Sequence, residues 1–119
     1  MKKYNSENEF QNRLFTSLVR YELQRNDMFI YHVPNGGFRD KITAKIMQWI
    51  GMRKGVSDLH IIGGGKILFI ELKIGKGIQS SEQKVFEQKI KYNGMQYWLV
   101  YDSEPIEVIV NKILTYLYN

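Results

Sequence analysis

Two short apolar segments joined by three glycines constrain the fold of this chain most. Residues 56–62 and 66–74 are rich in branched and aromatic side chains, a composition typical of β-strands. The glycines at positions 63–65 supply the backbone freedom of a tight turn, so the two segments are predicted to form a β-hairpin. Because side chains alternate across a strand, the hairpin also determines which residues share a face.

An acid and an amine share one face of the second predicted strand. Alternation places Ile67, Phe69, Glu71 and Lys73 on one side, and Leu68, Ile70 and Leu72 on the other. Burying Glu71 and Lys73 on this otherwise apolar face is costly unless they pair or bind something. The alternative interpretation is a solvated ion pair on an exposed face, since an E-x-K triplet also arises by chance.

The strand before the glycines adds a second carboxylate. Asp58 interrupts its apolar run, and neighbouring strands lie about 4.8 Å apart, so Asp58 and Glu71 can converge on one divalent cation. Mg²⁺ prefers oxygen ligands, lowers the pKa of a bound water and offsets charge on a phosphate. Lys73 can orient that water or stabilise the charge, and the Leu72 carbonyl is a further candidate ligand. The pattern suits metal-assisted phosphodiester hydrolysis.

The first predicted helix begins at Ser6, a candidate N-cap with Glu9 completing a capping box, and runs to about Gln24. Its 3.6-residue period places Glu7 at the head of the apolar stripe that contains Leu14 and Leu18, and turns Glu9 toward solvent. Glu7 could therefore favour the helix dipole or reach the metal site, and helix geometry alone leaves both open.

A later helix, predicted over residues 81–92, carries Gln83 on the same face as Phe86 and Ile90. The Gln83 amide could bond the backbone, the lysine at position 73 or the scissile phosphate. The other predicted elements are a strand at 28–33, a helix at 41–50, a strand at 96–101 and a helix at 106–117. Strands mixed with helices in 119 residues predict one α/β domain, with a central mixed sheet flanked by helices.

Composition excludes several classes of site. The chain has no cysteine, which rules out a disulfide scaffold, a thiol nucleophile and cysteine-bound metal. With His32 and His60 as its two histidines, it also fits poorly with a multi-histidine zinc site or a histidine-based RNase or tRNA-splicing nuclease.

No signal peptide or membrane helix is expected, so the predicted location is the cytoplasm. A net charge of +5 and a pI of about 9.4 fit a polyanionic partner.

Taken together, these motifs resemble the virus-type replication-repair nuclease (VRR-NUC) domain, a branch of the PD-(D/E)XK superfamily. The resemblance covers almost all of residues 1–119. It runs through ENEFQ at 7–11, PNGG at 34–37, GMRKGVSDL at 51–59, IELK at 70–73, and Gln83. One departure is Ser57, where the family usually has a proline; that proline is not a ligand, so its loss affects backbone rigidity more than activity.

The resemblance implies a restriction-endonuclease-like fold and a Mg²⁺-dependent endonuclease for structured DNA, with Mn²⁺ able to substitute. It implies a catalytic set supported by Gln83 and made of Glu7, Asp58, Glu71 and Lys73. The expected metal ligands are Asp58, Glu71 and the Leu72 carbonyl, with Glu7 bound directly or through water. A catalytically silent DNA-binding or assembly module of the same fold, or a flap or nicking nuclease, is the alternative.

Several further residues have two interpretations each. The candidate phosphate contacts are Arg39, Arg53, Lys54 and Lys76, which could equally be solvated surface charge. His60 follows Asp58 by two residues, so it could touch DNA or the metal's surroundings, or it could be a packed structural histidine.

The expected assembly is a homodimer acting on branched DNA, with a four-way junction as the best guess. One small domain offers few phosphate contacts, whereas a two-fold dimer doubles them and presents two active sites for two matched cuts. The resemblance points the same way for stand-alone members of the family. The aromatic side chains considered for an apolar interface, or alternatively for the core, are Trp49, Tyr97, Trp98, Tyr116 and Tyr118.

Overall fold

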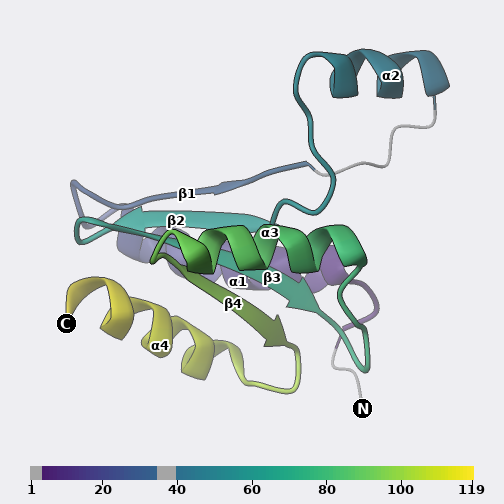
Figure 1. The fold of residues 1–119 in the computed structure, drawn as a ribbon. Helices are drawn as coiled ribbons and strands as arrows, with labels where there is room; N and C mark the ends of the chain where they lie inside the picture. The colour runs from purple at the N-terminus through teal and green to yellow at the C-terminus, as the bar shows by residue number, and fades with distance from the viewer. Residues whose placement is uncertain (1–3, 35–39) are drawn as a thin grey trace.

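The computed structural model describes residues 4–34 and 40–119, and within them the helices and strands follow the predicted order (Figure 1). The elements are α1 (Glu7–Glu22), β1 (Phe29–His32), α2 (Lys41–Trp49), β2 (Leu59–Gly63), β3 (Lys66–Lys73), α3 (Ser81–Tyr92), β4 (Gln96–Tyr101) and α4 (Ile106–Tyr118). Most bounds differ from the predicted ones by at most two residues. Positions 35–37 of the PNGG segment lie outside the described residues.

The strands form one mixed sheet in the order β1-β2-β3-β4. β2 pairs antiparallel with both β1 and β3, whereas β4 runs parallel to β3. The predicted hairpin closes through Gly64 and Gly65, whose φ angles of 59° and 74° are in the region that favours glycine. A Cβ atom at Gly64 would also collide with the backbone carbonyl of Leu117. The predicted α/β class, a central mixed sheet flanked by helices, is confirmed.

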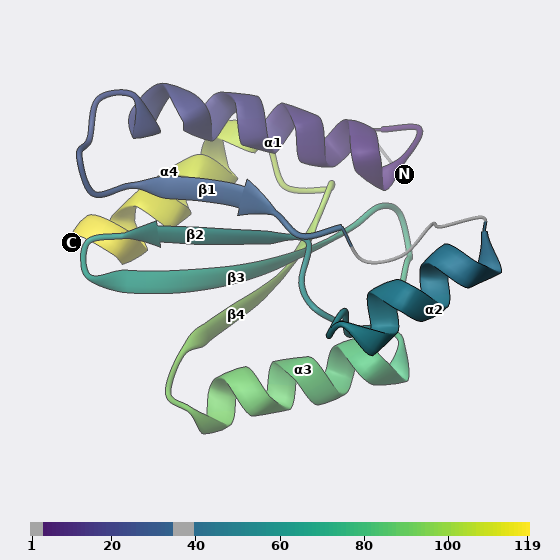
Figure 2. The same ribbon diagram turned by 90° about the horizontal axis from the view of Figure 1, so that it is seen from above.

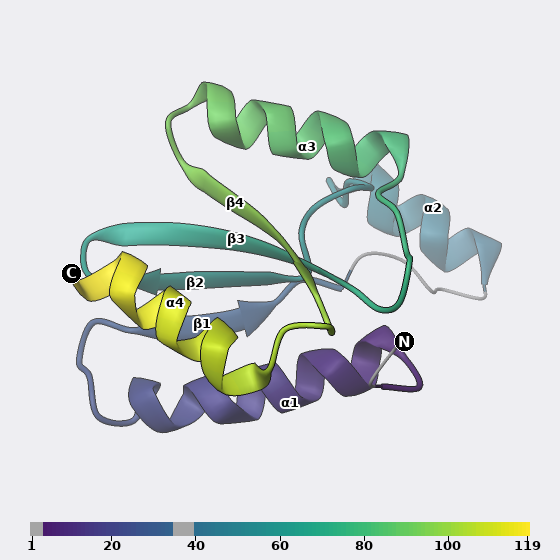
Figure 3. The same cartoon turned by 90° about the horizontal axis from the view of Figure 1, so that it is seen from below.

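Helices cover both faces of the sheet (Figures 2 and 3). α1 and α4 pack on one face, where the larger apolar core includes Leu68, Ile70 and Leu72 of β3. The opposite face carries a smaller cluster in which Phe69 packs with Tyr97 and with Ile90 of α3. The predicted division of β3 side chains between two faces is therefore correct, and Glu71 and Lys73 lie on the side facing α3.

One boundary matters for the site. The sequence predicted Asp58 within the strand at 56–62, but β2 begins at Leu59 and Asp58 lies just before it. The backbone N–H of Leu72 donates to the Asp58 carboxylate at 2.8 Å. A side chain thus accepts the hydrogen bond from β3 at the point where the β2 ladder stops. The pairing of β2 with β3 therefore begins at Leu59, because the Asp58 carboxylate takes the place of a backbone acceptor for the Leu72 N–H.

Helix α2 differs from the other three in its surroundings. It has no buried residue, and it stands away from the sheet in Figure 1. The loop that follows it is fixed at Gly55, where an added Cβ would meet the backbone of Glu82 at the start of α3. Within residues 4–34 and 40–119, no helix has the length and apolar character needed to cross a membrane.

A candidate metal centre

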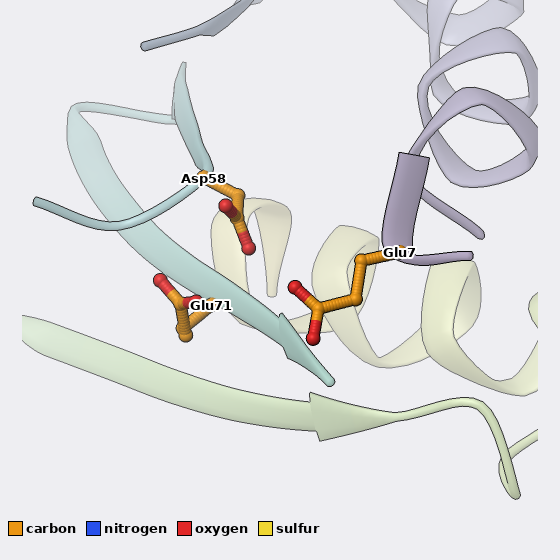
Figure 4. Close-up of side chains that lie close together, drawn as sticks. All are labelled: Glu7, Asp58 and Glu71. Carbon is orange, nitrogen blue, oxygen red and sulfur yellow. The ribbon is translucent and has the colours of Figure 1, made fainter. Parts of the chain in front are cut away.

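Three carboxylates from separate parts of the chain converge at one end of the sheet. Glu7 begins α1, Asp58 precedes β2 and Glu71 lies in β3. One oxygen of each lies within 4.8 Å of one oxygen of the others, and Figure 4 shows the three groups turned toward one another. Like charges this close repel each other, so the arrangement needs protons or a cation to be stable.

Glu71 is the most deeply buried of the three, with 1% of its surface exposed. Its Oε2 atom accepts a hydrogen bond from Nε2 of Gln83 at 2.8 Å and lies 3.8 Å from Nζ of Lys73. Its Oε1 atom is buried and has no hydrogen-bond partner among the described residues. A buried carboxylate oxygen without a donor is costly, and a bound cation would satisfy it.

Gln83 links the helix cap of α3 to this carboxylate. Its Oε1 accepts from the backbone N–H of Ser80 at 2.8 Å, while the Ser80 hydroxyl accepts from the Gln83 N–H, which completes a capping box. The same amide donates to Glu71 through Nε2. Of the contacts predicted for Gln83, the backbone bond forms, but the side-chain partner within the chain is Glu71 and not Lys73.

Asp58 is fixed through both its side chain and its backbone. Its carboxylate accepts from the Leu72 N–H, and its carbonyl accepts from the Val33 N–H at 3.1 Å and contacts Nδ1 of His32 at 3.0 Å. In a strand, the N–H and C=O of one residue point to the same edge, so the Leu72 carbonyl also faces this side of β3. Its position is consistent with the predicted role as a ligand.

Glu7 reaches the cluster because the first turn of α1 is held in place. The Ser6 hydroxyl accepts from the Glu9 N–H at 3.1 Å, as an N-cap does, although the reciprocal half of the predicted capping box does not form within the described residues. Phe10 and Leu14 then bury the stripe that Glu7 heads. Glu9 is exposed and lies outside the cluster, as the helical phase had predicted.

Burial governs the protonation of this site. It raises the pKa of Glu71 to about 8, and the repulsion from Asp58 adds to this shift while Lys73 opposes it. Burial also raises the pKa of Glu7, again opposed by Lys73 and reinforced by Asp58. The donor set consists of carboxylate oxygens and a nearby backbone carbonyl, which is the chemistry that Mg²⁺ and Mn²⁺ accept. The residues present therefore fit a hard divalent cation.

His60 belongs to an aromatic row and not to the acidic cluster. Its ring makes edge contacts with Tyr31 and Phe69, and Nδ1 lies 3.0 Å from the Tyr31 hydroxyl. Burial lowers the pKa of His60, so the ring is neutral near pH 7. Of the two interpretations of His60, the geometry favours the packed structural histidine.

The candidate phosphate contacts lie on the surface. Arg53 and Lys54 follow α2, and Lys76 follows β3; all three are exposed and form no ion pair with any described residue. Arg39 lies outside the described residues. Exposed cations without acidic partners remain available to a polyanion.

Sequence reasoning did not anticipate a groove of about 620 Å³ beside the cluster. The groove adjoins the acidic cluster, because two of its lining residues are next to cluster members: Asn8 follows Glu7 in the chain, and His32 contacts the Asp58 carbonyl. The residues that line it are Asn8, Gln11, Asn12, Phe15, Ile30, Tyr31 and His32. The amides of α1 repeat at helical spacing, a sequence signal that could have indicated a polar wall.

Comparison of the chain with protein-family models, curated proteins and solved structures yields no match. The resemblance to the VRR-NUC domain stays a sequence-based expectation. What the structure adds is the convergence of Glu7, Asp58 and Glu71, with Lys73 and Gln83 both next to Glu71.

Proposed function

We propose that this chain is a Mg²⁺-dependent DNA endonuclease of the PD-(D/E)XK type. The observation that carries the proposal is the group of three carboxylates within 4.8 Å of one another, with the Lys73 ammonium 3.8 Å from Glu71. Both Glu71 and Lys73 are buried, so they are not the solvated surface pair of the alternative interpretation. Retaining several charges in a buried site is expensive, which favours a chemical role.

Asp58, Glu71 and the Leu72 carbonyl would hold the cation, with Glu7 completing the set directly or through water. When bound, Mg²⁺ lowers the pKa of a water and offsets charge on the scissile phosphate. The chain supplies Lys73, whose ammonium can donate to the attacking water or to a phosphate oxygen that gains negative charge. Gln83 keeps the Glu71 carboxylate in one orientation through its 2.8 Å hydrogen bond.

A DNA substrate is supported by charge. The chain carries +5 at neutral pH, and Arg53, Lys54 and Lys76 are exposed without acidic partners in the described chain. Phosphate contacts by such side chains supply most of the sequence-independent affinity for DNA. We propose branched DNA in the cytoplasm as the substrate, with the four-way junction as the best candidate. Its two matched cuts require two active sites, and one chain has one acidic cluster among its described residues.

The test is a cleavage assay with Mg²⁺ or Mn²⁺ on linear, nicked, flap and four-way-junction DNA, alongside DNA-binding measurements. Wild type should cut only with a divalent cation, and Asp58→Asn should bind DNA without cutting it. Glu9→Gln is the matched control, because this exposed acid lies outside the cluster and its variant should cut like wild type. If wild type binds DNA but releases no product with either metal, the silent DNA-binding module replaces the nuclease.

A further inference from the structure

The groove beside the acidic cluster runs between helix α1 and the edge strand β1, which lie side by side in Figure 2. Three amide side chains line its helix wall, and their spacing of i, i+3 and i+4 places them on one stripe of α1. They are Asn8, Gln11 and Asn12. None of these side-chain amides forms a hydrogen bond with a described residue. An amide with an unbonded donor and acceptor can bind a ligand that presents the complementary pair.

The edge strand β1 supplies the opposite wall. The Val33 N–H donates to the Asp58 carbonyl on the β2 side, and in an antiparallel ladder alternate residues point their backbone groups away from the partner strand. The residues that point away from β2 are Ile30 and His32. The Ile30 N–H donates to the Glu22 carboxylate at 2.8 Å, which confirms this direction. The Ile30 carbonyl and both backbone groups of His32 therefore face the open edge, so both walls of the groove carry hydrogen-bonding groups.

The groove also has an apolar surface. Phe15 and Ile30 both line it; Ile30 belongs to the larger core, and the half-buried ring of Phe15 packs against that core. An aromatic ring bordered by amides suits a planar heterocycle, which can stack on the ring while its edges form hydrogen bonds. The lining residues include no Asp, Glu, Lys or Arg. The groove therefore fits an uncharged planar group and not a phosphate.

We propose that this groove binds one unpaired nucleobase of the DNA substrate, next to the scissile phosphate at the acidic cluster. The assignment rests on the proposed nuclease function and adds one feature of its substrate, an unpaired nucleotide beside the bond that is cut. Both walls of the groove reach the cluster, because Asn8 follows Glu7 and Nδ1 of His32 lies 3.0 Å from the Asp58 carbonyl. A base is one sugar away from its phosphate, so a nucleotide can occupy both places at once.

Size and hydrogen bonding favour this occupant. The groove volume of about 620 Å³ is within the range of roughly 300–1,000 Å³ that is typical of small-molecule sites. A paired base has its Watson–Crick edge occupied and its faces stacked, so only an unpaired base can enter between α1 and β1. A peptide strand added to the edge of β1 is a poorer occupant. It would need successive backbone hydrogen bonds, and the Ile30 N–H is already bonded to Glu22.

Fluorescence anisotropy with a labelled forked DNA, in EDTA so that no strand is cut, tests this site. The fork is compared with the same fork carrying abasic residues at the first unpaired positions. Wild type should bind the abasic fork roughly tenfold more weakly, the order expected for the loss of one stacked base. Gln11→Leu and Phe15→Leu should bind both forks alike. Gln88→Leu and Tyr92→Leu, which change exposed side chains of α3, are matched controls and should keep the tenfold difference.

Photo-cross-linking then locates the base, with 5-iodouracil at the first unpaired position and circular dichroism to check that every variant folds. Mass spectrometry should find the cross-link within residues 8–15 or 30–32, and a cross-link elsewhere overturns the proposal. Equal binding of the two forks by wild type also overturns it, as does an abasic penalty that Gln11→Leu and Phe15→Leu both retain. Metal-dependent cleavage alongside any of these results would leave the nuclease assignment intact. Base-dependent binding without cleavage would instead keep the base site and remove the nuclease.

Discussion

Replacing Glu71 with glutamine should change how the stability of the metal-free protein depends on pH. Burial, reinforced by Asp58, raises the pKa of Glu71 from 4.5 to about 8 in the folded state. Between these pH values the folded protein holds a proton that the unfolded chain has released. The stabilisation is therefore complete below about pH 4.5 and is lost as the pH rises toward 8.

The size of the effect follows from the same shift. One pH unit within this window corresponds to about 1.4 kcal/mol, so wild type should lose on the order of 3 kcal/mol between pH 5 and pH 7 through this group. For a domain of this size that is roughly 10 °C in Tm. Glu71→Gln keeps the shape of the side chain and can still accept from Gln83, but it has no proton to release. The variant should therefore gain stability relative to wild type as the pH rises.

Thermal and urea unfolding in EDTA at pH 5, 6, 7 and 8 would measure this difference. Glu9→Gln removes an exposed acid from the same end of the molecule and should follow the wild-type curve. Adding Mg²⁺ at pH 8 should recover the wild-type stability but leave Glu71→Gln nearly unchanged. A gap between Glu71→Gln and wild type that is the same at pH 5 and pH 8 would refute the idea that a buried, repelled carboxyl titrates here.

Four further outcomes are expected. Asp58→Asn and Lys73→Ala should each lower cleavage by about a hundredfold or more in gel assays, with DNA affinity preserved; wild-type rates in Asp58→Asn would show the site to be misplaced. Glu7→Gln should impair cleavage far more than Glu9→Gln, and the reverse order would contradict the helical phase. Mg²⁺ at a hundred times its Kd should stabilise wild type by about 2.7 kcal/mol in melting experiments, but not Asp58→Asn. Gln83→Ala should cost about 1 kcal/mol by urea unfolding through the lost capping box, and should also slow cleavage.

Local rules were enough to predict several parts of the site. Strand alternation placed Glu71 and Lys73 on one face of β3 because the period of two is a property of any extended chain. Helical phase separated Glu7 from Glu9, and Ser6 at the start of α1 predicted its N-cap. These predictions succeeded because each depends on residues within a few positions of one another.

Other features were decided by contacts between distant segments. The bond from Gln83 to Glu71 joins residues 12 apart, and β2 begins only after Asp58, whose carboxylate accepts from Leu72, 14 residues away. The position of His60 in the aromatic row depends on Tyr31 from a different strand. No local pattern specifies such pairs, because they follow from how the elements pack and not from backbone geometry.

The sequence by itself determined the order of the elements, the two faces of the hairpin strand and the identity of the charged residues, since propensity and periodicity act over a few residues. Only the tertiary structure brought Glu7, Asp58 and Glu71 to one place, because strand pairing and the packing of α1 on the sheet fix the distances between segments far apart in the chain. Only the tertiary structure left Ile42, Ile46 and Trp49 of α2 exposed among the described residues, because periodicity shows that a helix has an apolar side but not what packs against it.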